Sequence, residues 1–400
     1  MLQQTADDIE EYNALTSVLS SFYEYGNWAR RTFLIPRRLK WESLSREEHE
    51  LLPWFEDHLN YLENCILQNE IFTKNLATTI AGNWQVSTDP TSWHNCKVSD
   101  LDKVKSVLNQ FVREWSEEGI EERDVSFNKI LKECVLLYPD LQQRPNLKVL
   151  VPGAGLGRLV FEFVKLGFQT QGNEFSYHML LASNFILNHS YVAHHHNIYP
   201  HIHKFSNHAK RINQIRPVSI PDSDPHDINR MSNEGSGIQY DELMSMCAGS
   251  FIDLYGPSNL NISETYSGDK SALDFRKLNE NNFQIIATCF FLDTATNIID
   301  YLKTIHHSLD PQGYWINFGP FLWHFEDDDS ITNEVNKDNQ MKPTPLKGLE
   351  LTREDLIELV KKCGFKFLKY ENNIETTYAS SKDSLGGYRY ECDYWLCQKV

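Results

Sequence analysis

The sequence lacks the features that mark several large classes of protein. Its eight cysteines are scattered over 400 residues without a Cys-x-x-Cys pair, so no zinc knuckle is indicated, and we expect reduced thiols in an intracellular protein. No apolar run is long enough to span a bilayer, and the N-terminus lacks the basic and apolar blocks of a signal peptide. These absences predict a protein without a membrane partner, located in the cytoplasm and also in the nucleus.

Basic residues are scarce as well. Lys and Arg number 38 against 55 Asp and Glu, which gives a formal net charge of -17. A surface of that sign repels phosphate backbones, so we expect no nucleic-acid partner, whereas a neutral or cationic small substrate is compatible with it. Hydrophobic residues make up 41% of the chain and aromatic residues 12%, enough for a real core.

Two patterns divide the chain. Residues 1–140 predict helices, with capping boxes at Thr5 and at Ser45; these helices cover about Thr5–Phe33, Leu51–Leu76, Val98–Trp115 and Asp124–Leu137. Residues 141–400 alternate instead between strand and helix, beginning with Lys148–Val151, Leu156–Leu166, Phe168–Asn173 and Ser176–Asn188. This order predicts an α/β fold with a doubly wound, mostly parallel sheet.

The alternation is interrupted between about residues 190 and 280, which we interpret as a long insertion with a strand or two within it. We expect the sheet to resume at Phe283–Thr288. The elements predicted after it are a helix at Asn297–Ser308, a turn at Asp310–Gly313, a strand at Tyr314–Phe318, a surface loop at Glu326–Lys342, a helix capped by Thr352, and two closing antiparallel strands at Phe365–Glu371 and Tyr388–Cys397.

A glycine-rich loop follows the first predicted strand, in the segment VLVPGAGLGR from Val149 to Arg158. Glycines at a strand-to-helix turn let the backbone approach a ligand closely, and the helix N-terminus behind them offers free N–H groups. In a nucleotide enzyme that helix end faces phosphate, and in a methyltransferase it faces the methionine carboxylate of S-adenosylmethionine. The spacing is G-x-G-x-G at Gly153, Gly155 and Gly157, whereas dinucleotide folds use G-x-G-x-x-G.

Glu174 lies 21 residues after Gly153, at the end of the second predicted strand. A carboxylate there can accept both ribose hydroxyls of a bound nucleoside, in NAD enzymes as in methyltransferases. Methyltransferases commonly carry an acid two positions before the first glycine, but here that position is Val151. Another group must therefore bind the cofactor's amino group.

Several motifs together resemble the carnosine N-methyltransferase family, from about residue 40 to the C-terminus. They are VPGAGLGRL from Val151, QGNEFS from Gln171, SNFILN from Ser183, Asp293–Ala295, NIIDY from Asn297, WINFGP from Trp315, and QFVREWS from Gln110. The resemblance implies a seven-stranded methyltransferase sheet, S-adenosylmethionine as cofactor, and methyl transfer to an imidazole nitrogen of the histidine in carnosine, giving anserine, or in related histidyl dipeptides.

The same resemblance implies a set of cofactor-binding residues. Gln110 and Arg113 match a pair that closes over the cofactor from the helical region, and Arg113 would pair with the methionine carboxylate. From the residues alone, a solvated helix face is the alternative for both. Ser250 and Phe251 match the adenine region, where Ser250 replaces an acid and Asp253 is a candidate substitute.

Four residues are the implied catalytic and substrate-binding group: Asp293, His324, Tyr388 and Tyr390. We expect Asp293, at the C-terminal end of a core strand, to orient the acceptor imidazole or its amine. The two tyrosines, two apart on a late strand, would share one face. The alternatives are a helix N-cap for Asp293, a core histidine for His324 and core aromatics for the tyrosines.

Six histidines between His194 and His208 invite a metal interpretation. Their spacing is irregular and no acidic or cysteine partner completes a ligand pattern, so we expect no functional metal. Three other functions stay open: a protein or peptide histidine methyltransferase, a non-catalytic cofactor-binding protein, and an NAD-dependent oxidoreductase. The resemblance also suggests a homodimer, with the helical N-terminal region as candidate interface.

Overall fold

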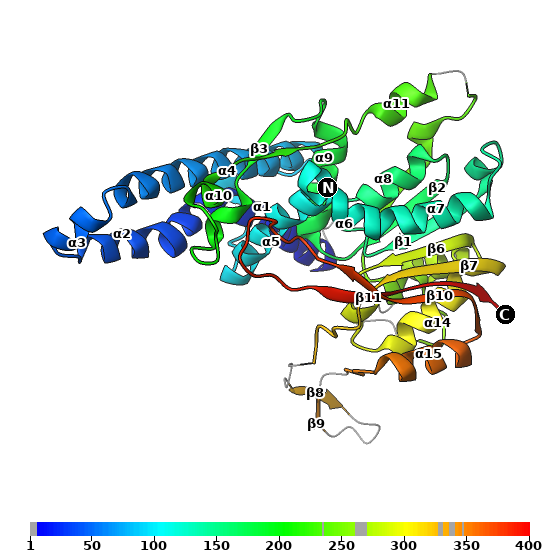
Figure 1. Ribbon diagram of the computed structural model, residues 1–400. Helices are drawn as coiled ribbons and strands as arrows, with labels where there is room; N and C mark the ends of the chain where they lie inside the picture. The colour runs from blue at the N-terminus through cyan, green and yellow to red at the C-terminus, as the bar shows by residue number, and fades with distance from the viewer. Residues whose placement is uncertain (1–5, 234–235, 261–269, 327–330, 336–340, 346–347) are drawn as a thin grey trace.

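The computed structural model describes residues 6–233, 236–260, 270–326, 331–335, 341–345 and 348–400. A seven-stranded sheet lies at its centre, in the order β10-β11-β7-β6-β1-β2-β5 (Figure 1). The strands of this sheet are β1 (Lys148–Pro152), β2 (Gln169–Glu174), β5 (Met244–Ala248), β6 (Phe283–Cys289), β7 (Leu309–Gly319), β10 (Phe365–Thr376) and β11 (Tyr390–Lys399).

The strands β7, β6, β1, β2 and β5 are parallel to one another, and β11 is antiparallel to both β7 and β10. The prediction of a mostly parallel sheet with an antiparallel pair at one edge is therefore confirmed. The carboxyl ends of β1, β2, β5 and β6 lie along one edge of the sheet, where open α/β sheets bind their ligands.

Helices cover both faces of the sheet, as Figure 1 shows with α7 and α8 above it and α14 and α15 below. Successive residues of β1 point to opposite faces, so Val149 packs with the core under α7 and α8 whereas Leu150 packs with the core under the other helices. The covering helices are α7 (Phe127–Leu137), α8 (Arg158–Lys165), α12 (Phe251–Tyr255), α13 (Lys270–Leu278), α14 (Ile298–Ser308) and α15 (Arg353–Lys362).

The N-terminal region is helical. Its helices are α1 (Ala6–Ala29), which continues through a π-helical turn at Arg30–Leu34, α2 (Ile35–Glu42), α3 (Arg46–Leu51), α4 (Phe55–Asn83), α5 (Val98–Trp115) and α6 (Ile120–Val125), with α9 (Tyr177–His189) packed against them. The bounds of α5 agree with its prediction. The capping box at Ser45 is present, but it caps the short α3, and the long helix begins only after Pro53. The predicted box at Thr5 lies outside the described residues.

The region predicted as an insertion holds a small antiparallel pair, β3 (His196–Ile198) and β4 (Val218–Ile220), and two short helices, α10 (Arg211–Ile215) and α11 (Asp227–Ser232). It also holds β5, which pairs with β2 as an edge strand of the main sheet. The expectation that the sheet resumes only at Phe283 is therefore wrong, because it resumes at β5.

One local prediction in the C-terminal part is also wrong. The segment predicted as a surface loop at 326–342 contributes to an antiparallel pair, β8 (Ile331–Val335) and β9 (Met341–Pro345). The predicted turn at Asp310–Gly313 is present as an irregularity within β7, because the pairing with β6 passes from Leu309 to Tyr314 and Asp310 Oδ1 accepts from the N–H of Gln312 at 3.0 Å. None of the helices in the described ranges is both long and apolar enough to cross a membrane.

Candidate active site

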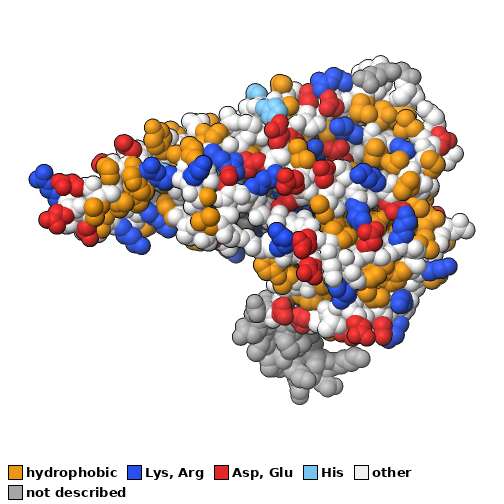
Figure 2. Space-filling view, in the orientation of Figure 1, with side chains coloured by type: hydrophobic (Ala, Val, Ile, Leu, Met, Phe, Trp, Pro, Cys, Tyr) orange, Lys and Arg blue, Asp and Glu red, His pale blue; other side chains and the backbone are white. Residues whose placement is uncertain are grey.

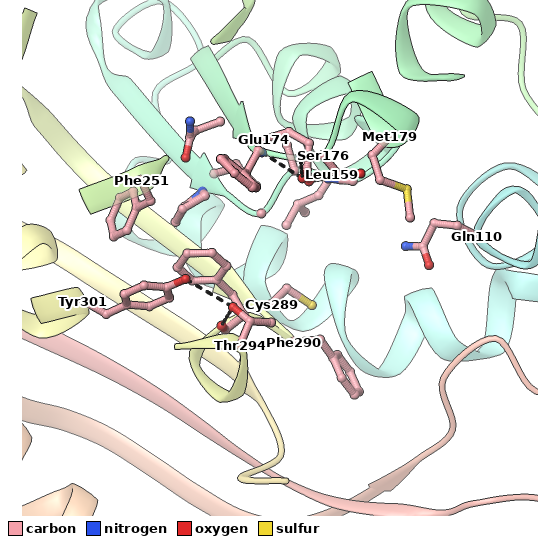
Figure 3. A pocket seen from close by; sticks show the side chains of 18 of the residues that line it. Gln110, Leu159, Glu174, Ser176, Met179, Phe251, Cys289, Phe290, Thr294 and Tyr301 are labelled. Atoms are coloured by element: carbon pink, nitrogen blue, oxygen red, sulfur yellow. Dashed lines mark hydrogen bonds between the residues drawn. The ribbon is translucent and has the colours of Figure 1, made fainter. Parts of the chain in front are cut away.

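A cavity of about 590 Å³ opens at the carboxyl ends of the central strands (Figure 3). Eight of the predicted site residues line it: Gln110, Arg113, Gly153, Gly155, Glu174, Ser250, Phe251 and His324. They come from positions as far apart in sequence as α5 and the segment after β7. Four others, Gly157, Asp293, Tyr388 and Tyr390, are outside this lining.

The glycine loop joins β1 to α8. Gly153 has a φ of +67°, and a Cβ placed there would lie 2.5 Å from the ring of Phe291, so a side chain is excluded by conformation and by space. Gly157, with a φ of +80°, is the N-cap of α8 and packs against Ser183 and Leu187. Its place is therefore in the turn that starts the helix, while Gly153 and Gly155 form the cavity wall.

Glu174 ends β2, with its carboxylate held by three backbone N–H groups. Gly155 donates to Oε2 at 2.9 Å, and Phe175 and Ser176 donate to Oε1 at 2.9 and 2.8 Å (Figure 3). Burial raises the pKa of this carboxyl above its usual range, against the lowering effect of these hydrogen bonds. The side chain thus fixes the glycine loop to the second strand and faces the cavity from there.

Helix α5 supplies three polar side chains to the cavity from one face, since they lie three and four residues apart. Gln110 donates from Nε2 to Glu114 Oε1 at 2.6 Å and accepts from the Tyr378 hydroxyl at 3.0 Å. Arg113 is 4% exposed and its guanidinium carbon lies 4.3 Å from the centre of the Tyr378 ring. The alternative of a solvated helix face is therefore wrong for both Gln110 and Arg113.

An aromatic wall lines the cavity next to Gly153 of the glycine loop. Phe291 and Tyr301 stack with ring centres 4.8 Å apart, and Phe251 meets both rings edge-on at 5.4 and 5.6 Å. Ser250 is the N-cap of α12, since its hydroxyl accepts from the backbone N–H of Asp253. Asp253 is buried within α12 and is not among the lining residues, so Ser250 is the one of this pair that faces the cavity.

Asp293 lies in the turn after β6, 3% exposed, and its Oδ1 atom has no hydrogen-bond partner among the described residues. Burial raises its pKa to about 7. Asn297, and not Asp293, caps α14, because the Asn297 side chain accepts from the N–H of Ile299 at 3.1 Å. The N-cap alternative for Asp293 is therefore wrong.

His324 lies directly beside Asp293, since its backbone N–H donates to the Asp293 carbonyl at 3.0 Å. Its side chain is exposed on the cavity lining, so it is not a core histidine. Tyr390 begins β11 and meets the lining residue Phe290 edge-on at 5.6 Å. Tyr388 precedes the strand and is 60% exposed, so the prediction that both tyrosines lie within one strand is wrong. The centres of the two tyrosine rings are nevertheless only 4.6 Å apart.

The model of the carnosine N-methyltransferase family matches residues 90–400. Over nearly its whole length the chain is also 37% identical to the carnosine N-methyltransferase of Schizosaccharomyces pombe, with 98% of this chain and 97% of that protein covered. The chain belongs to the carnosine N-methyltransferase family. The enzyme of that name from Mus musculus is 35% identical, over 99% of this chain and 88% of that protein, and the one from Dictyostelium discoideum is 32% identical, over 97% and 76%.

Membership of the carnosine N-methyltransferase family makes the protein an S-adenosylmethionine-dependent methyltransferase, and the cavity residues fit that cofactor. Gly153 and Gly155 leave a backbone cradle that a Cβ would fill. Arg113 brings a buried guanidinium whose Nε and Nη2 have no hydrogen-bond partner in the part of the chain that the structure describes, which leaves these donors for a carboxylate. The NAD-dependent and non-catalytic alternatives are accordingly not favoured.

Several lining residues of this carnosine N-methyltransferase homologue were not predicted from the sequence, and two polar ones among them are Glu114 and Tyr378. Glu114 follows Gln110 by four residues, so the helical periodicity that grouped Gln110 with Arg113 could have found it. Tyr378 lies in an irregular segment after β10, where no periodicity points to it. Its hydroxyl nevertheless donates a hydrogen bond to Gln110 Oε1 at 3.0 Å.

The histidines between His194 and His208 that make polar contacts do so with different partners. His203 bonds the Tyr25 hydroxyl at 2.7 Å, His201 lies 3.8 Å from Glu118, and His208 bonds the carbonyl of Lys204 at 2.9 Å. In the part of the chain that the structure describes, no three His, Cys, Asp or Glu side chains group as metal ligands, and all eight cysteines are free thiols.

Proposed function

We propose that this enzyme transfers a methyl group to an imidazole nitrogen of the histidine in carnosine, giving anserine, or in a related histidyl dipeptide. The observation that carries the proposal is Asp293, a buried carboxyl beside the cofactor cavity whose Oδ1 has no hydrogen-bond partner among the residues that the structure describes. The names of the relatives support it, because each is a carnosine N-methyltransferase at 32–37% identity.

When bound, S-adenosylmethionine supplies an electrophilic methyl group on its sulfonium sulfur. The acceptor imidazole must be neutral, with the lone pair of one nitrogen aimed at that carbon. Asp293 accepts the N–H of the other imidazole nitrogen, which fixes the tautomer and stabilises the positive charge that the ring gains. With a pKa of about 7, the same carboxylate can take the ring proton afterwards and pass it to water.

His324 and the tyrosines complete the acceptor site in this proposal. His324 is fixed beside Asp293 through its backbone, and Tyr390 approaches the cavity through Phe290. Tyr388 lies on the open side of Tyr390, at the surface. The four side chains would thus surround a small ring at the cavity mouth.

The test is turnover of carnosine, other histidyl dipeptides and histidine-containing peptides, with the products identified by mass. We expect dipeptides to be methylated on the ring; exclusive turnover of longer peptides would instead support a peptide histidine methyltransferase. Asp293→Ala should reduce turnover by about 10²-fold or more, with Asp274→Ala on the exposed face of α13 as control. Activity of Asp293→Ala within about threefold of wild type would contradict the assigned role.

We further propose that the enzyme forms a homodimer through its helical prong, defined as α2, α3 and α4. Large apolar side chains are exposed along it, namely Ile35, Leu39, Leu51, Tyr61, Leu67 and Ile71. The prong extends beyond the sheet domain, and Figure 2 shows apolar side chains on its surface between charged ones. A second copy could cover them, because an exposed apolar surface of this kind favours association.

A further inference from the structure

The N-terminus of α8, which we expected to face the methionine carboxylate of the cofactor, already holds a carboxylate of the protein. Glu114 Oε2 accepts from the N–H of Arg158 at 3.2 Å, and Oε1 accepts from the N–H of Leu156 at 3.3 Å. A helix N-terminus attracts anions through such groups, but a second carboxylate would meet like charge here. The cofactor's carboxylate must therefore bind elsewhere.

Arg113 provides the other place. It is 4% exposed, it lines the cavity, and its Nε and Nη2 atoms have no hydrogen-bond partner within the described ranges. The acid nearest to it is Glu122, with 3.7 Å between Arg113 Nε and Glu122 Oε2, beyond hydrogen-bond distance. A buried guanidinium with unused donors is a strong site for a carboxylate.

Glu114 is then placed to bind the opposite charge. It is 3% exposed, it lines the cavity beside Arg113, and a Cβ on Gly155 would lie 2.5 Å from its Oε1 atom. A carboxylate offers about four acceptor positions. Three are used, by Gln110 Nε2 and by the N–H groups of Leu156 and Arg158. One acceptor position is left for a donor from the ligand.

The charges of the residues that line the cavity also favour binding of the cofactor's amino acid end here. Among the described residues that line the cavity, the Asp, Glu, Lys and Arg side chains are one base, Arg113, and two acids, Glu114 and Glu174. S-adenosylmethionine carries an ammonium, a carboxylate and a sulfonium, so its net charge is complementary. Val151 occupies the position from which an acid commonly reaches the ammonium, and an apolar side chain cannot do so.

We propose that Glu114 binds the α-ammonium group of the cofactor, in place of the missing acid at Val151, while its neighbour Arg113 binds the α-carboxylate. The two consecutive side chains on α5 thus recognise the zwitterionic end of the ligand as a unit. The same Glu114 holds Leu156 and Arg158 of the glycine loop, so cofactor recognition and loop position depend on one carboxylate. The proposal rests on the cofactor and not on the identity of the methyl acceptor.

The test is calorimetric titration, without any acceptor, of wild-type enzyme and Glu114→Gln with three ligands. These are S-adenosylhomocysteine, its analogue with hydrogen in place of the α-amino group, and 5′-methylthioadenosine, which lacks the amino acid. We expect Glu114→Gln to weaken S-adenosylhomocysteine binding about 10- to 100-fold, and binding of the other two ligands less than about threefold. Glu162→Gln, which alters a carboxylate on α8 outside the lining, is the matched control and should leave all three affinities unchanged.

An equal loss of affinity for all three ligands would overturn the proposal, because Glu114 would then act only by holding the loop. Should Glu114→Gln fail to fold, the wild-type enzyme decides: an undiminished affinity for the deaminated analogue would overturn the proposal too. Since no acceptor is present, a negative result here leaves carnosine methylation intact. Failure to methylate carnosine would in turn leave this binding result standing.

Discussion

At the scale of single residues, Asp293 combines burial with a carboxylate oxygen that has no hydrogen-bond partner in the described part of the chain. Its pKa rises to about 7 in the folded protein because burial disfavours the charged form. The protonated carboxyl is therefore favoured by folding, and its contribution to stability is present at low pH and is lost as pH rises toward and through 7. An acceptor imidazole that donates to Oδ1 would offset this cost.

We predict that Asp293→Asn stabilises the ligand-free enzyme at alkaline pH. We compare the free energy of unfolding of the variant with that of wild type at each pH. The difference in favour of the variant should be about 2 kcal/mol larger at pH 8 than at pH 5, because the amide has no charge to bury. Urea unfolding at both pH values measures the difference, with Asp274→Asn as an exposed control. A difference that does not change with pH would contradict the prediction.

Tyr378 contacts two of the cofactor residues, with its hydroxyl on Gln110 and its ring over Arg113. Tyr378→Phe keeps the ring and removes the hydroxyl, so Gln110 loses a hydrogen bond worth about 1 kcal/mol. We predict a severalfold weaker affinity for S-adenosylhomocysteine by calorimetry. Tyr388→Phe, at an exposed hydroxyl, should leave that affinity unchanged, and equal effects of the two variants would argue against the role of Tyr378.

The site residues that the sequence could predict are those fixed by a local pattern. Gly153 and Glu174 follow from their places after two strands, and Gln110 with Arg113 follow from the family resemblance and share a helix face. Tyr378 could not be predicted, because its contact with Gln110 spans 268 positions of the chain. A contact of that range depends on the whole fold and leaves no spacing in the sequence.

At the scale of elements, the β1–α8 turn depends on glycine for two separable reasons, backbone conformation and space. Gly153→Ala should destabilise the enzyme by about 1–3 kcal/mol and weaken S-adenosylhomocysteine binding, because the added methyl group would clash with the Phe291 ring. Chemical denaturation and calorimetry measure the two effects.

Gly237 offers a control with the same strain and no clash. Its φ is +76°, close to the +67° of Gly153, and a Cβ there would meet nothing within 4 Å. Gly237→Ala should therefore cost only the conformational part, about 1 kcal/mol, and leave ligand affinity unchanged. Equal destabilisation by the two variants would show that the Phe291 contact is not what excludes a side chain from Gly153.

The elements were predictable where periodicity and turn chemistry agree. Helix α5 has a strong amphipathic pattern and was placed correctly at Val98–Trp115. Strand β5 was missed as a member of the sheet because its sequence, MSMCA, lacks β-branched residues and its position at the sheet edge leaves it only partly buried. Pairing with β2 makes it a strand, and pairing is a tertiary property that no local window contains.

At the scale of the whole molecule, the enzyme is asymmetric. A prong of helices extends to one side of the compact sheet domain, and the cavity lies where the N-terminal helices meet the sheet (Figures 1 and 3). Helix α5 links the two parts, since the Trp115 indole N–H at its end donates to the carbonyl of Leu156 in the glycine loop at 3.1 Å. The cofactor site and the prong are thus both built in part from the N-terminal helices, but the tip of the prong lies away from the cavity.

This separation allows association to be tested apart from ligand binding. We predict that the wild-type enzyme sediments as a dimer and that the double variant Leu39→Glu, Leu51→Glu is a monomer. The two leucine side chains are 60% and 77% exposed, and the glutamates that replace them would place four charges in the interface of two copies. Leu136→Glu, at a side chain 70% exposed on α7, should remain dimeric. S-adenosylhomocysteine affinity should be the same in all three proteins, since the substitutions avoid the cavity. A wild-type monomer, or a prong variant that stays dimeric, would exclude this interface.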